Sequence, residues 1–74
     1  MEFFQEVVSW QSEKWLVQGQ WEDTRNDPTG QTGCIEIEMV WEDEGRIAVP
    51  NTTMTVLSEL GLEDATFKHL MDAR

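Results

Sequence analysis

The acidic side chains are the largest group in this chain that could carry chemistry or binding. The 74 residues include 15 Asp and Glu against 5 Lys and Arg, so the formal net charge is −10. Eight of the 15 acids fall between Glu22 and Glu44, a stretch that contains one arginine. Clustered carboxylates can bind a cation, serve as the acid and base of a hydrolase, or contact a basic protein surface. Each of these uses needs its own spacing.

The spacing of the acids does not fit metal binding or hydrolysis. Residues 23–27 resemble the start of a calcium loop, but Pro28 replaces its glycine and Cys34 stands where its bidentate Glu belongs. Residues 42–44 are typical of a solvated turn. Paired catalytic carboxylates need a cleft around the substrate, and a domain of this size buries only about 60% of its unfolded surface. We therefore predict no metal and no cofactor.

The sequence also lacks the sets of residues that nucleophilic catalysis and phosphate binding require. Cys34 and His69 are the single cysteine and the single histidine, and nothing in the sequence brings them together as nucleophile and base. The glycine-containing segment 28–33 lacks the Lys-Ser/Thr ending of a phosphate-binding loop. One cysteine also excludes an intrachain disulfide and favours a reducing, cytoplasmic setting. We therefore expect that the protein is not an enzyme.

The charge balance favours a basic protein surface as the partner. DNA, RNA and anionic lipid are polyanions and would be repelled, so we expect no direct nucleic-acid contact. The chain has no run near the ~20 apolar residues of a membrane span, and residues 1–6 do not resemble a secretory signal. A nucleic-acid-binding enzyme or complex would offer a suitable basic surface. The alternative is that the charge only keeps the protein soluble or reflects a halophilic source.

On the strand predicted over residues 34–42, the acids would form a row. Apolar side chains occupy alternate positions and acids occupy most positions between them. Glu36 and Glu38 would lie about 6.7 Å apart on one face, from two strand steps, which is close to the spacing of successive phosphates. Such a row could imitate a nucleic-acid backbone. The predicted apolar face holds Ile35, Ile37, Met39 and Trp41, and the predicted acidic face holds Glu36, Glu38 and Glu42.

Three further runs also read as strands. Residues 46–49 should pair with the acidic strand through a two-residue turn at 44–45, where a glycine accepts positive φ. Residues 15–21 form an upstream strand in which Gly19 marks a bulge or a close approach. The first residues of the chain fit either a helix or a strand, and a strand over residues 5–11 is favoured.

The last third of the chain changes to a helical period. Met54, Leu57 and Leu60 recur three residues apart, and Gly61 is a natural end for a helix. A second helix is predicted within residues 62–73. Acids near its start and bases near its end suit the helix dipole.

These elements predict one α+β domain over residues 1–74. It is a small antiparallel β-meander of three to four strands, followed by one or two short C-terminal helices that cover one face. Residues 24–33 are rich in Asn, Asp, Pro and Gly and should form a loop. The predicted core consists of Val17, Ile35, Ile37, Trp41, Leu57, Phe67 and Leu70.

Four tryptophans are many for a chain of this length. Trp21 and Trp41 fall on the apolar faces of their strands, so both are predicted in the core. Trp10 and Trp15 lie close together near the start, and one of these rings, left partly exposed, would anchor a protein interface. The alternative is that all four serve as large core residues of a very small domain.

The favoured function is that of a small acidic protein-binding module. It would dock a carboxylate-rich sheet face on a basic partner and inhibit or modulate it. Small acidic proteins of this type are common among phage-encoded inhibitors and bacterial accessory proteins, an analogy that no residue motif supports. The alternatives are a virion or assembly component or a homo-oligomer that uses a sheet edge or an uncovered sheet face, and a non-catalytic regulatory subunit. The predicted partner-binding residues are Glu22, Asp23, Glu36, Glu38, Glu42, Asp43, Glu44, Trp10 and Trp15.

Overall fold

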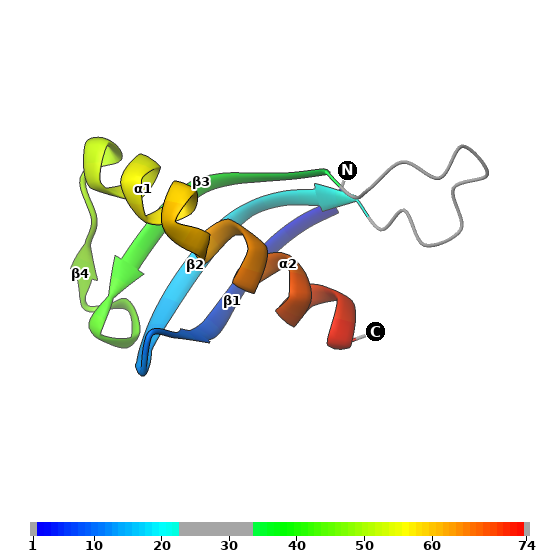
Figure 1. Cartoon of the computed structure of the whole chain (residues 1–74), viewed down its shortest axis with the longest axis horizontal. Helices are drawn as coiled ribbons and strands as arrows, with labels where there is room; N and C mark the ends of the chain where they lie inside the picture. The colour runs from blue at the N-terminus through cyan, green and yellow to red at the C-terminus, as the bar shows by residue number, and fades with distance from the viewer. Residues whose placement is uncertain (1, 23–33, 74) are drawn as a thin grey trace.

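Four antiparallel strands followed by helices make up residues 2–22 and 34–73, the part of the chain that the computed structural model describes (Figure 1). The strands lie in the sheet in the same order as in the sequence, which confirms the predicted α+β meander. The predicted loop over residues 24–33, the calcium-like segment and Asp23 lie outside the described residues. The elements are β1 (Glu2–Trp10), β2 (Glu13–Glu22), β3 (Cys34–Glu42), the 3-10 turn η1 (Asp43–Gly45), β4 (Ile47–Ala48), α1 (Asn51–Leu57), the π-helical turn η2 (Ser58–Leu62) and α2 (Glu63–Asp72).

β1 and β2 form a tight hairpin. The start of the chain is thus a strand, as favoured from the sequence, and it begins earlier than predicted. Trp10 pairs with Glu13, which leaves Gln11 and Ser12 as the two turn residues. Their φ angles are 55° and 62°. Positive φ at both positions is typical of a type I′ turn, which suits the twist of the strands and favours Asn-Gly.

Replacing Gln11→Asn together with Ser12→Gly should stabilise the protein. Left-handed backbone costs most residues roughly 1 kcal/mol or more, and Asn and Gly tolerate it better. Glycine also raises the entropy of the unfolded chain, so we expect a net gain of about 1 kcal/mol in the free energy of unfolding. Urea denaturation measures this gain. The same residue changes within β1, Gln5→Asn with Ser9→Gly, should destabilise the protein, and a destabilised turn variant would contradict the turn assignment.

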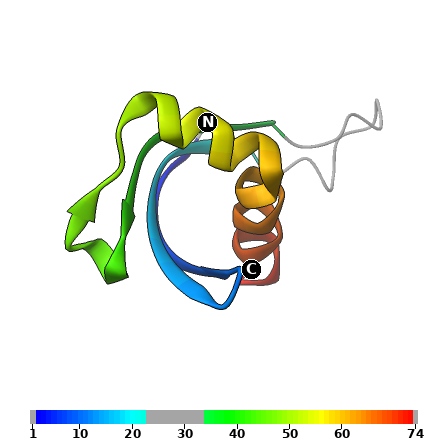
Figure 2. The same cartoon turned by 60° about the vertical axis from the view of Figure 1, so that its left-hand side comes forward.

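The helices cover one face of a strongly curled sheet (Figure 2). β1 and β2 bend around α2, and α1 contacts β3. Trp21 packs edge-on against Phe67 of α2, with the ring centroids 5.9 Å apart, an arrangement that aromatic pairs favour. The buried apolar core between sheet and helices consists of Phe4, Val8, Trp15, Val17, Trp21, Val40, Val49, Leu62 and Leu70.

A β-bulge in β3 interrupts its pairing with β2. The pairing skips Glu38, an extra residue of β3 opposite the step from Gln18 to Gly19. A Cβ atom on Gly19 would overlap the carbonyl oxygen of Glu36. The two backbones therefore approach more closely than any residue other than glycine allows. The bulge or close approach predicted at Gly19 is confirmed.

Because of the bulge, the alternation predicted for β3 holds only in its first half. Ile35 and Ile37 face the helices and pack against the core. Beyond the bulge the pattern shifts by one residue. Val40 is fully buried, while Met39 and Trp41 turn to the opposite face of the sheet. The prediction of Trp41 in the core was therefore wrong, because one inserted residue reverses every later side chain of the strand.

The other predicted core residues do contribute to the core. Val17 and Leu70 are buried. The buried hydroxyl of Thr66 donates a hydrogen bond to the Leu62 carbonyl oxygen at 2.7 Å, so this polar group is satisfied. The predicted members that are partly buried against the core are Ile35, Ile37, Leu57 and Phe67.

The break predicted at Gly61 separates the two helices. Gly61 lies in η2 with φ 130° and ψ −2°, a conformation that residues with a side chain avoid. The turn shifts the helical phase, so Leu62 is fully buried and Leu60 is 68% exposed. The apolar spacing of Met54 and Leu57 therefore does not continue to Leu60.

The connection from β3 to β4 is longer than predicted. Trp41 pairs with Ala48 and Glu42 with Ile47, so residues 43–46 form the turn. The pairing predicted for this segment is confirmed, and the two-residue turn at 44–45 was wrong. Three consecutive residues of this turn, Asp43, Glu44 and Gly45, have positive φ, whereas a two-residue hairpin turn contains at most two such residues.

Candidate functional site

The face of the sheet opposite the helices is uncovered in the described part of the chain (Figure 2). Residues paired across antiparallel strands share a face, so the register identifies its members. Val7 pairs with Leu16, and Trp41 pairs with both Leu16 and Ala48. These four side chains form an apolar row across all four strands. The outer face consists of Phe3, Gln5, Val7 and Ser9 of β1, Lys14, Leu16, Gln18, Gln20 and Glu22 of β2, Cys34, Glu36, Met39 and Trp41 of β3, and Ala48 of β4.

Large apolar side chains are exposed on the outer face. Phe3 is 63% exposed, Val7 45% and Met39 36%, while Leu16 and Trp41 are half-buried. Three of these fourteen residues are charged: Lys14 and Glu22 near the two ends of β2, and Glu36 of β3. The central apolar row itself carries no charge. An apolar patch with few charges is typical of a surface that binds another protein.

The register does not form the predicted carboxylate row. Glu36 lies on the outer face opposite Gln20, and Glu38 is the extra residue of the bulge. Glu42 pairs with Ile47 at the far end of β3. The regular two-residue spacing therefore fails between the first two acids, since the bulge falls on the second. The role of these three acids in partner binding stays a prediction.

The remaining predicted acids lie at the ends of strands. Glu22 ends β2 opposite Cys34, and Asp43 and Glu44 form η1. Arg46 approaches Asp43 with 3.5 Å between Nη1 and Oδ1, and both side chains are mostly exposed. A surface ion pair of this kind contributes at most about 1 kcal/mol. Asp43 and Glu44 are exposed in the turn, whereas Glu22 lies at the edge of the outer face.

The two N-terminal tryptophans are packed side chains. Trp15 is 5% exposed, and its indole N–H donates to the carbonyl oxygen of Trp10 at 3.1 Å. The two rings are 6.0 Å apart, and Trp10 is half-buried beside Gly61. Trp15 is therefore unavailable as an exposed anchor. The tryptophan on the outer face is Trp41, which the sequence pattern had assigned to the core.

Cys34 and His69 occupy different settings. Cys34 is exposed at the start of β3. His69 of α2 lies 3.9 Å from Glu6 of β1, measured from Nε2 to Oε2, so its nearest charged partner is a carboxylate.

Among the described residues, no group of three or more His, Cys, Asp or Glu side chains is placed to hold a metal ion. No helix in residues 2–22 or 34–73 is long and apolar enough to cross a membrane.

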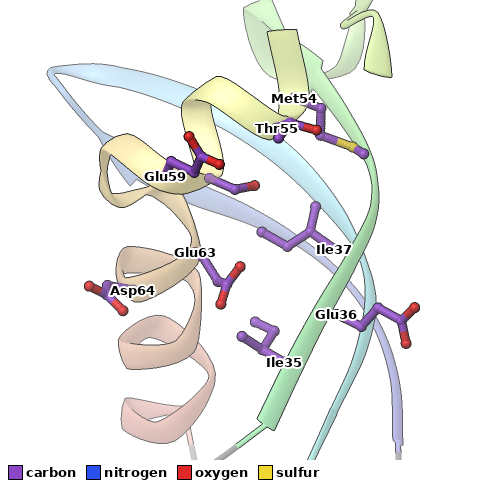
Figure 3. Close-up of a pocket in the computed structure, with 9 residues that line it drawn as sticks. Ile35, Glu36, Ile37, Met54, Thr55, Glu59, Glu63 and Asp64 are labelled. Carbon is purple, nitrogen blue, oxygen red and sulfur yellow. The ribbon is translucent and has the colours of Figure 1, made fainter. Parts of the chain in front are cut away.

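A second feature, which we call the β3 groove, lies between β3 and the helices (Figure 3). Its volume is about 500 Å³. Ile35 and Ile37 point into it from β3, and Met54 of α1 lies at one end (Figure 3). Glu59 and Glu63 line the helical side with their carboxylates. The groove therefore combines an apolar floor with an acidic rim.

The β3 groove could not be identified from the sequence. Its acids belong to the helical segment and its apolar residues to β3, and no local pattern connects the two. The sequence does predict docking through the solvent-facing side of residues 34–42, which includes Glu36, but as a carboxylate-rich face and not as an apolar one.

Comparison with known proteins adds no family to this description. The chain matches no protein-family model, no curated protein and no solved structure.

Proposed function

We propose that the protein is a non-catalytic protein-binding module that docks through its outer face. The observation that supports this is the apolar row of Val7, Leu16, Trp41 and Ala48, flanked by exposed Phe3 and Met39. Burying such side chains against a partner contributes about 25 cal/mol per Å² of apolar surface before the costs of association. A solvated sheet face without a partner would carry polar residues in this central row as well.

The partner is a protein with an apolar contact surface in basic surroundings. The chain carries a net charge of −10, and Glu22 and Glu36 are the carboxylates that the register places on the outer face, so most of the described acids lie outside the contact area. Charges outside a contact accelerate association with an oppositely charged partner and lose this effect as salt rises. A nucleic-acid-binding enzyme offers such surroundings, and docking there would inhibit or modulate it. Apolar burial, rather than imitation of phosphates, supplies the affinity.

A pair of double variants tests the docking face. Val7→Glu with Met39→Glu places two charges on the outer face, whereas Val56→Glu with Leu60→Glu changes two exposed apolar residues on the helical side. Both shift the net charge from −10 to −12. Tagged proteins are used to capture partners from a lysate of the producing cells. Burying unpaired charge in an interface costs several kcal/mol, so the outer-face variant should retain a specific partner at least about tenfold less than the control.

Light scattering on the purified protein identifies a second copy as the partner. A wild-type dimer that becomes a monomer in the outer-face variant alone would assign the face to self-assembly. Equal partner retention by both variants, with both folded by circular dichroism, would contradict docking through this face.

A further inference from the structure

We propose that the β3 groove is a second binding site, which takes an extended peptide with Lys or Arg at alternate positions. The peptide adds to the free edge of β3 as an extra strand. This site is separate from the outer face and does not depend on docking there. Three observations carry the proposal: an edge without a strand partner, an apolar floor beside it, and an acidic rim.

Among the described residues, the edge of β3 that faces away from β2 is unpaired over most of its length. β3 pairs with β2 on one side, but on the other side β4 reaches only Trp41 and Glu42. The amide of Val49 continues the ladder by one bond to the carbonyl oxygen of Val40, at 2.8 Å. Within the described residues no strand pairs with the preceding part of this edge. An unpaired row of N–H and C=O groups is a template for an added strand.

The floor of the groove matches the side-chain period of a strand. Ile35 and Ile37 both point toward the helices and are two residues apart, about 6.7 Å along the strand (Figure 3). Side chains at alternate positions of an added strand have the same repeat and would lie beside them on the same face. Both isoleucines are only partly buried, so they retain apolar surface that a ligand can cover.

The rim sets the charge of the ligand. Glu59 and Glu63 stand across the groove from the two isoleucines, and both are exposed. Lys and Arg carry a long apolar stem below a charged head. Their stems would cover Ile35 and Ile37 while their heads reach the carboxylates. A basic extended segment can pair with the edge of β3, cover the apolar floor and contact the carboxylates of the rim. An acidic segment would be repelled by these carboxylates.

Binding of a synthetic peptide to the full chain tests this site. The probe is a fluorescein-labelled heptapeptide, Thr-Lys-Thr-Lys-Thr-Lys-Thr, and fluorescence anisotropy reports its affinity. The version with Glu in place of Lys should not bind. Glu59→Lys with Glu63→Lys should weaken binding by about tenfold or more, since each change replaces attraction with repulsion. Glu13→Lys with Asp72→Lys makes the same change in net charge away from the groove and should weaken it by less than about threefold.

N-methylation of the peptide tests the added strand. Only alternate residues of an edge strand donate hydrogen bonds to its neighbour. Methylating the amides of the lysines or of the threonines should therefore have unequal effects, with one set weakening binding by about tenfold or more and the other leaving it nearly unchanged. Equal effects of the two sets, or equal losses in the two double variants, would overturn the proposal.

The outer-face variant separates this site from the proposed function. Val7→Glu with Met39→Glu should bind the basic heptapeptide as the wild type does. Loss of peptide binding in this folded variant would overturn the β3 groove as the site, whatever the outcome of partner capture.

Discussion

Replacing Gly19→Ala should lower the free energy of unfolding by about 3 kcal/mol or more. The added methyl group would overlap the backbone carbonyl oxygen of Glu36, and a backbone atom cannot rotate away as a side chain can. Extra atoms in a packed site typically cost 1–3 kcal/mol, and here the bulge must also shift. For a domain of this size 3 kcal/mol corresponds to a fall of more than about 10 °C in the melting temperature, measured by circular dichroism.

The neighbouring Gln20→Ala is the control for this variant. Gln20 lies on the outer face of the same strand, where truncation removes no core contact. Its cost should stay within about 0.5 kcal/mol. An unchanged melting temperature for Gly19→Ala would mean that the strands do not approach at the bulge as described.

Replacing Leu62→Ala should destabilise the protein by about 3–5 kcal/mol. Leu62 is fully buried between the sheet and the helices, so its truncation removes apolar contacts and leaves a cavity. Small domains have little stability to lose, and a substantial unfolded fraction at 37 °C is expected. Thermal and urea denaturation measure the effect.

Leu60→Ala provides a control of the same residue type two positions away. Leu60 is 68% exposed, so the same truncation should change stability by less than about 0.5 kcal/mol. Equal costs at the two positions would contradict the helical phase that Gly61 sets. A larger cost for Leu60 would reverse the assignment of the two leucines.

The meander and its helices follow from local patterns, whereas the faces of β3 do not. Ile35 and Ile37 lie on the side that the alternation predicts. Trp41 does not, because the bulge adds Glu38 and reverses the later positions. The signal for this change lies on another strand, at Gly19. A period-two pattern within one strand cannot register an irregularity that arises from the packing of two strands.

The candidate site was harder to predict than the fold. The acids of β3 favoured a charged face, but because the bulge reverses Met39 and Trp41 the same face gains a central apolar row. One local pattern in β1 does indicate an apolar outer face. Phe3-Phe4 and Val7-Val8 are adjacent apolar pairs, and in a strand each pair places one member on either face. Phe4 and Val8 enter the core, and Phe3 and Val7 remain on the outer face.

The order of the strands has a consequence for the speed of folding. Every strand pairs with its neighbour in the sequence, so no strand pairing has to skip an intervening strand. The entropic cost of closing a loop, expressed as free energy, rises by only about 0.6 kcal/mol for each doubling of the loop length. Small mixed domains with mostly local contacts fold far faster than β-sandwiches, which depend on distant pairings. Rapid folding shortens the time during which the strands that carry the apolar row are unpaired. Unpaired apolar strands are prone to aggregate.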